Sequence, residues 1–66
     1  MDVKKLRLEM LKAQVTQKDL AAKCGVSTAT FSKKMHHPEL FTCGEALIIS
    51  TTLRLSPLER ASIFLL

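Results

Sequence analysis

The feature that most constrains this chain is a run from Thr16 to Met35 that is organised around a single glycine. The Thr16 hydroxyl can accept hydrogen bonds from the free N–H groups of a first helical turn. Leu20 and Ala21 then occupy one face of that helix. Gly25 tolerates the left-handed backbone that ends a helix and allows a sharp turn. The pattern predicts two short helices that are joined at this glycine.

The second of these helices has an apolar side and a polar side. Ser27 can cap its N-terminus, and Phe31 and Met35 recur at helical spacing, which points them toward a core. Between these apolar positions lie small polar residues and two lysines, Lys33 and Lys34. A helix of this kind suits insertion into a groove that is lined with hydrogen-bonding edges and phosphates.

Together these residues resemble the helix-turn-helix of the lambda-repressor-like, Cro-type regulators, in the short form common in phages and prophages. The family's Thr-Gln-x-x-Leu-Ala signature stands at residues 16–21, and the turn at 25–27 and the aromatic Phe31 also match. The likeness continues in segments between residues 39 and 57, which fit the family's fourth and fifth helices. It implies a compact, all-α, five-helix DNA-binding domain with the helix-turn-helix at about residues 16–36.

Periodicity and capping signals also predict five short helices in residues 1–66, as one domain without strands. The first helix is expected to end at Ala13. Capping patterns open a fourth helix at residues 42–45, which is expected to run to about Arg54, and a last helix at residues 56–59. The expected core stripes are Val3, Leu6, Met10 and Ala13 in the first helix, Ala46, Ile49 and Leu53 in the fourth, and Leu58, Ala61 and Leu65 in the last.

The resemblance also implies which side chains would face the bases of DNA. The family's reading positions fall on Thr28, Ala29 and Lys33 of this sequence, with Ser32 on the adjoining edge. Lys33 can donate to guanine O6 and N7, whereas the methyl groups of Thr28 and Ala29 suit the thymine methyl. Family members often carry a glutamine at the first or second reading position, and this chain does not. Direct readout is therefore expected to be weaker here, or shifted toward apolar contact and DNA shape.

The DNA backbone is expected to be held mainly by the start of the motif. The family uses a glutamine like Gln17 to hold a phosphate, and the free N–H groups of that helix terminus also favour an anion. Lysines outnumber acids five to one between Lys12 and His37, in a chain whose net charge is +4, as a phosphate-binding region requires. Further candidate phosphate contacts are Lys18, Lys34, His36 and Thr42, and the alternative for Lys34 is a solvated lysine without a partner.

Several apolar residues lie off the expected core stripes and suggest contact with a second copy of the chain. They are Leu47, Ile48, Ile63, Phe64 and Leu66. Because family members commonly dimerise through their last helices, the hypothesis is a two-fold interface. Such an interface would place two reading helices about 34 Å apart on a near-palindrome. The alternative is local, with Phe64 wrapping back over the core.

Other activities find little support in the residues. Cys24, His36, His37 and Cys43 match no common zinc spacing, so neither a metal nor another cofactor is expected. The serines and threonines are accounted for as helix caps, and no acid–base pair is expected to share a pocket, so the chain is not expected to be an enzyme. No apolar run is long enough to span a membrane. With a charged start and only two cysteines, the chain is expected in the bacterial cytoplasm, on the nucleoid when bound to DNA.

The sequence therefore predicts a regulator that binds a double-stranded DNA operator as a homodimer and acts by occupancy, with no small-molecule effector. Two alternatives remain open. One is the DNA-binding antitoxin of a toxin pair, and the other is a protein-interaction module that keeps the fold without binding DNA. A salt titration separates the last alternative, because each phosphate contact contributes about −0.9 to the slope of log affinity against log salt.

Overall fold

The helices of this chain begin where a side chain accepts hydrogen bonds from first-turn N–H groups. The structure is a computed structural model that describes residues 1–64. That part of the chain contains five α-helices, one short 3₁₀ helix and no strand, which confirms the predicted all-α class. The α-helices and their capping residues are α1 (Val3–Ala13) after Asp2, α2 (Gln17–Cys24) after Thr16, α3 (Thr28–His36) after Ser27, α4 (Cys43–Thr52) after Thr42 and α5 (Pro57–Phe64) after Ser56, and the 3₁₀ helix η1 (Pro38–Leu40) joins α3 to α4.

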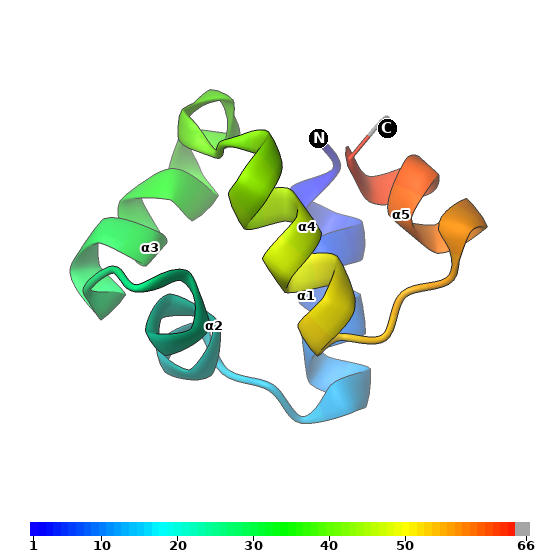
Figure 1. Cartoon of the computed structure of the whole chain (residues 1–66), viewed down its shortest axis with the longest axis horizontal. Coiled ribbons are helices and arrows are strands. Elements are labelled where there is room, and N and C mark those ends of the chain that lie inside the picture. Colours follow the sequence, from blue (N-terminus) through cyan, green and yellow to red (C-terminus); the bar gives the residue numbers. More distant parts are fainter. Residues whose placement is uncertain (65–66) are drawn as a thin grey trace.

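The α2–α3 pair and α5 lie on opposite sides of the molecule (Figure 1). In the same view α4 crosses between them at the front, and α1 runs behind α4. Phe41, which follows η1, packs edge-on against Phe31 with the ring centroids 5.4 Å apart. The core lies where the helices converge, and its fully buried side chains come from each α-helix in turn: Leu6, Leu20, Phe31, Ile49 and Ile63.

Three residues with left-handed backbone angles turn the chain between helices. Gly25 ends α2 at a φ of 73°, as the sequence predicts. Gln14 ends α1 at a φ of 56°, and Arg54 follows α4 with a φ of 55°. A residue with a Cβ loses roughly 1–2 kcal/mol in this conformation, and no glycine marks these two turns in the sequence. Local hydrogen bonds accompany both turns, because the Val15 and Leu55 N–H groups donate to the Met10 and Ser50 carbonyls at 2.9 Å.

The last helix faces the core with residues other than those predicted. Ile63 and Phe64 are only 2% and 9% exposed, so the prediction that they lie off the core is wrong, and the alternative of Phe64 packing over the core is confirmed. Leu58, predicted for the core, is 84% exposed. The reason is the docking of α5 by its C-terminal end, where the Asp2 N–H donates to the Ile63 carbonyl at 2.7 Å. Leu58, in the first turn, lies at the far end of that helix.

Smaller differences occur at the ends of other helices. Ala13 is exposed in the last turn of α1, against the prediction of a core position. α4 ends at Thr52, slightly before the predicted Arg54. No helix among residues 1–64 has the length and apolar composition needed to cross a membrane. Leu65, predicted for the core, and Leu66, predicted for an interface, lie outside the described residues.

Candidate nucleic-acid interface

α2 is held at both ends by bonds that its own sequence supplies. At its start the Thr16 hydroxyl accepts from the Asp19 N–H at 3.1 Å, and the Asp19 carboxylate accepts from the Thr16 N–H at 2.9 Å. That backbone donor holds the pKa of Asp19 below its ordinary value, so the carboxylate is charged at neutral pH. At the other end, no atom lies within 4 Å of the place that a Cβ on Gly25 would occupy. The backbone angle, and not a close neighbour, therefore explains this glycine.

The predicted reading residues lie on the solvent side of α3. Opposite them, Phe31 and Met35 are buried and anchor the helix in the core. The helical period separates the two sets, so the anchoring residues do not obstruct access to the reading residues. The reading set comprises Thr28, Ala29 and Lys33, which are exposed, and Ser32, which is partly exposed.

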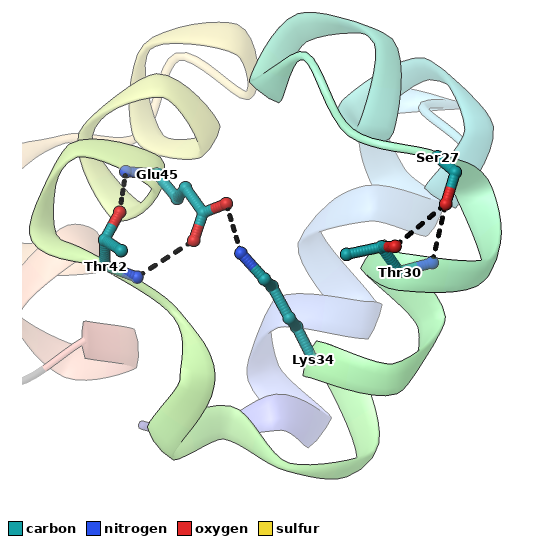
Figure 2. A network of polar contacts seen from close by, with 5 residues as sticks. All are labelled: Ser27, Thr30, Lys34, Thr42 and Glu45. Carbon is teal, nitrogen blue, oxygen red and sulfur yellow. Dashed lines mark hydrogen bonds and ion pairs between the residues drawn. The ribbon is translucent and has the colours of Figure 1, made fainter.

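Two polar networks hold α3 near its two ends (Figure 2). At the N-terminus the Ser27 hydroxyl accepts from the Thr30 N–H at 3.1 Å and lies 2.9 Å from the Thr30 hydroxyl. Toward the C-terminus Lys34 reaches from α3 to Glu45 in the first turn of α4, with its Nζ 2.5 Å from Oε2 of the carboxylate. Side-chain chemistry therefore sets the position of α3 relative to α4, in addition to the packing of the core.

Glu45 caps α4 and binds α3 at the same time. Its N–H donates to the Thr42 hydroxyl at 3.1 Å, and its Oε1 accepts from the Thr42 N–H at 2.9 Å. Donation by Lys34, with help from the Thr42 backbone, holds the pKa of Glu45 below its ordinary value. The Lys34 and Glu45 side chains are only 17% and 12% exposed, so salt screens this pair less than a surface pair.

The same pairing argues against Lys34 as a phosphate contact. To reach DNA, its ammonium would have to leave Glu45 and strand a charged carboxylate in a largely buried place. Thr42 is better placed, because its side chain is exposed. Its hydroxyl accepts from Glu45 and still has its own hydrogen to donate to a phosphate oxygen.

The other predicted phosphate contacts lie near the start of α2 and the end of α3. Gln17 is partly exposed and Lys18 is exposed, in the first turn of α2, where N–H groups have no acceptor within the helix. The charged Asp19 in the same turn reduces the attraction of this end for an anion. His36 is exposed, and its Nδ1 lies 2.9 Å from the Ser32 carbonyl oxygen. Because a carbonyl only accepts, Nδ1 carries the hydrogen in this bond and Nε2 is left for another partner.

Part of the positive charge counted in the sequence is already paired. Lys12 lies 3.3 Å from Glu9 within α1, and Lys34 is bound to Glu45. Lys23 borders a groove beside α4 and not the α3 side. Of the five lysines between Lys12 and His37, three have no acidic partner among residues 1–64: Lys18, Lys23 and Lys33.

Two of the predicted interface residues, Leu47 and Ile48, are exposed on the outer side of α4. They line an open groove with Thr51 and Thr52. The Thr51 and Thr52 hydroxyls donate to the Leu47 and Ile48 carbonyls at 2.9 and 2.8 Å, one turn back in the helix. These hydroxyls donate inside α4, so the charged group that this side offers to a partner is the Lys23 ammonium.

Sequence reasoning missed the Lys34–Glu45 pair. The capping signal identifies Glu45 as an acceptor for a backbone N–H, but nothing in it points to a partner eleven residues earlier on another helix. Cys24, near the end of α2, is partly buried and packs against the core. That burial raises the pKa of the Cys24 thiol, which stays protonated and behaves as a small apolar side chain.

Comparison of the chain with protein-family models, with curated proteins and with solved structures finds no match. The geometry of α2, α3 and α4 therefore carries the functional argument by itself. The observations that matter are the exposed side of α3 and the hydrogen bonds of Ser27 and Lys34 near the two ends of that helix.

Proposed function

We propose that this protein is a sequence-specific, double-stranded-DNA-binding transcriptional regulator of the Cro and repressor kind, which acts by occupying an operator. The observation that carries the proposal is the exposed side of α3, where Thr28, Ala29 and Lys33 face solvent on a helix anchored in the core. α2 packs against α3 across the turn at Gly25, and α3 would serve as the recognition helix of a helix-turn-helix.

In this proposal α3 enters the major groove, which is wide enough to admit an α-helix. Lys33 donates to the O6 and N7 atoms of a guanine, and the methyl groups of Thr28 and Ala29 contact thymine methyls. Gln17 and Lys18, at the start of α2, hold an adjacent phosphate. Because Thr28 and Ala29 are small, the backbone of α3 can lie close to the base edges, which makes DNA shape part of the recognition.

The operator would be occupied by two copies of the chain, each reading one half-site. Two-fold symmetry in the protein then matches a near-palindrome in the DNA. In this proposal the protein's own concentration and competition with other regulators would control occupancy. Blocking of polymerase at the operator would follow from occupancy alone.

Selection of bound sites from a random duplex pool tests the proposal directly. We expect an enriched near-palindrome, and a pool that stays unenriched after several rounds would contradict DNA reading. With the selected duplex, affinity is then measured against salt concentration. Two copies that each neutralise one or two phosphates with lysine would give a slope of roughly −2 to −4 in log affinity against log salt.

Lysine variants separate base reading from phosphate holding. Lys33→Ala should weaken binding to the selected duplex by about 1–3 kcal/mol and relax its sequence preference. Lys18→Ala should weaken selected and random duplexes alike and reduce the salt slope by about 2, because one phosphate contact is lost from each of the two copies. Lys23→Ala removes the same charge from the side of α2 that borders α4, so it is the matched control and should bind normally.

The glutamine at the start of α2 provides an independent check. Gln17→Ala should weaken binding to both duplexes without changing the thermal unfolding of the free protein. Full affinity in both Gln17→Ala and Lys33→Ala would refute the proposed placement of α2 and α3 on DNA.

A protein-interaction module without DNA binding is the second candidate function. The exposed side chains of Leu8, Leu11 and Leu58 favour it, because grouped apolar side chains on a surface mark contact sites. A salt slope near zero, together with no enrichment of sites, would select this candidate. The antitoxin alternative shares the DNA-binding chemistry, and no feature of the described residues favours it.

A further inference from the structure

The last turn of α3 ends in a histidine whose two ring nitrogens have different surroundings. His36 Nδ1 lies 2.9 Å from the Ser32 carbonyl oxygen, one turn back in the helix. A carbonyl oxygen only accepts hydrogen bonds, so Nδ1 carries a hydrogen in this contact. His36 is exposed, and no atom of residues 1–64 forms a hydrogen bond with its Nε2. In the neutral ring with its hydrogen on Nδ1, Nε2 is an acceptor without a hydrogen.

A DNA phosphate does not suit this neutral ring. The phosphate oxygens of the DNA backbone are anionic and only accept hydrogen bonds. With the Ser32 carbonyl at Nδ1 and a phosphate at Nε2, both ring nitrogens of His36 would face acceptors. Only the imidazolium form has a hydrogen on each nitrogen. His36 can therefore hold a phosphate and keep its bond to Ser32 only when it has taken up a proton.

The position of His36 in α3 bears on this proton in two opposite ways. The last carbonyls of a helix have no N–H partner within it and attract a cation, which favours an imidazolium in the last turn. Lys33, three residues earlier, is a like charge and opposes it. A phosphate held between these two cations would remove their repulsion, so an added anion has a direct effect on the charge of the ring.

No acid of the protein takes the place of that phosphate. Glu39 lies 3.6 Å from Nδ1 of the neighbouring His37, and Glu45 is bound to Lys34. Asp19 is bonded to the N–H of Thr16 at the start of α2. Among residues 1–64, none of the three forms an ion pair with His36. The titratable groups of the elements packed against α3 are Lys18, Asp19, Lys23 and Cys24 in α2, Glu39 in η1, and Cys43 and Glu45 in α4.

We propose that a DNA phosphate bound at the end of α3 protonates His36, so that the affinity for DNA rises as the pH falls. The proton comes from the solvent, and the complex then has Nδ1–H on the Ser32 carbonyl and Nε2–H on the phosphate. Histidine is the side chain whose charge ordinarily changes between about pH 5 and 8, so the effect falls near neutrality. We rest this step on the proposed function, because the phosphate belongs to bound DNA.

The added contact changes affinity more than sequence preference. Phosphate contacts carry no sequence information, so selected and random duplexes should gain equally on acidification. His37 is a matched control for His36, because it is also exposed but faces the Glu39 carboxylate within the protein. Its charge is therefore linked to that acid and not to DNA.

Isothermal titration calorimetry with a duplex of mixed sequence measures the proton uptake. In two buffers of different ionisation enthalpy at about pH 7, the heats of binding should differ by an amount equivalent to as much as about one proton per bound chain. The affinity should rise by up to about tenfold per chain for each pH unit between about pH 8 and 6. Acidification should also steepen the salt slope by up to about 0.9 per chain.

Two substitutions of the same residue should have opposite effects on affinity. His36→Gln stays neutral, so it should lose the proton uptake and bind at every pH as the wild type does at about pH 8. His36→Lys has a permanent ammonium and should bind at about pH 8 as strongly as the wild type at about pH 6. His37→Gln should keep the pH dependence of the wild type. Circular dichroism melting at each pH shows that every variant is folded.

The possible failures are distinguishable. A wild type that binds no duplex at any pH would contradict the proposed function, and the protonation of His36 with it. DNA binding without proton uptake would overturn the protonation alone, and it is the result expected if the ring leaves Ser32 and presents Nε2–H as a neutral donor. Proton uptake that His36→Gln retains, or that His37→Gln abolishes, would assign the proton to another residue and overturn it as well.

Discussion

The α2–α3 pair and the α4–α5 pair bury their side chains according to different patterns. In α3, Phe31 and Met35 form one apolar stripe, and polar residues occupy the other side. In α4, Ile49 faces the core while Leu47 and Ile48 face outward, so apolar residues surround the helix. Periodicity still orients α4 correctly, because the predicted stripe of Ala46, Ile49 and Leu53 is buried. The difference between the two pairs therefore lies in α5, the helix whose predicted core side is wrong.

The same difference separates two kinds of surface. The outer side of α3 has hydroxyl, methyl and ammonium groups, which suit base edges and phosphates. Two other sides carry exposed leucine and isoleucine: Leu47 and Ile48 on α4, and Leu8, Leu11 and Leu58 on α1 and α5. The outer side of α3 is therefore polar and cationic, whereas these two sides are partly apolar.

The largest expected effect tests the orientation of α5. Phe64→Ala should lower the free energy of unfolding by about 3–4 kcal/mol, because it removes a buried ring from the core. Leu58→Ala, on the exposed end of the same helix, should change it by no more than about 0.5 kcal/mol. Urea unfolding of the monomer, followed by far-ultraviolet circular dichroism, measures both. The opposite ranking would mean that the stripe predicted from the sequence faces the core after all.

The next effect tests the link between the two pairs of helices. Lys34→Met should lower the free energy of unfolding by about 2 kcal/mol, because Glu45 loses its charged donor in a largely buried place. Lys33→Met is the matched neighbour, with an exposed ammonium, and should have almost no effect on unfolding. DNA binding should show the reverse pattern, with weaker binding to the selected duplex for Lys33→Met and unchanged binding for Lys34→Met. A salt slope that falls for Lys34→Met would restore it as a phosphate contact.

A smaller pair of effects on stability compares the two glycines, Gly25 at the end of α2 and Gly44 in the first turn of α4. Gly25→Ala should destabilise the protein by about 1 kcal/mol, because its φ of 73° is unfavourable for any residue with a Cβ. Gly44→Ala should stabilise it by up to about 1 kcal/mol, since the new Cβ would meet only the Thr42 hydroxyl at 3.8 Å and alanine favours helix. Thermal unfolding distinguishes the two. Equal effects would show that the turn at Gly25 tolerates a side chain.

The smallest effect is the acid dependence of stability. The pKa of Glu45 and that of Asp19 are lowered in the folded protein, so each carboxylate stabilises the fold above the pKa it has in the unfolded chain. That contribution is lost as the pH falls below about 4. Glu45→Gln should flatten the acid limb of the unfolding free energy more than Asp19→Asn, since only Glu45 has a lysine donor. Identical acid limbs in the two variants would contradict the coupling of Glu45 to Lys34.

Local signals in the sequence predicted the caps at the N-termini of the helices. Thr16 with Asp19, Thr42 with Glu45 and Ser56 with Glu59 all form the predicted caps, because each pair lies three residues apart in one first turn. The exposure of the reading residues on α3 could also be predicted, since Phe31 fixes the opposite side of that helix. The burial of Ile63 could not be predicted, because it depends on which helix packs against α5, and the left-handed turn at Gln14 was missed because no glycine marks it.

The amino-acid sequence by itself determined where the helices begin, where Gly25 turns the chain and which side of α3 meets solvent. Capping, backbone angles and amphipathic spacing act within a few residues, so these properties are encoded locally. Only the tertiary structure decided that Lys34 binds Glu45, that Phe64 is buried and that Leu58 is exposed beside a groove. Burial depends on the helices that close over a side chain, and those helices come from distant parts of the chain. The Thr16–Met35 run therefore defines the candidate DNA-binding surface, whereas the burial of Phe64 and the exposure of Leu58 are decided only when α5 docks on α1.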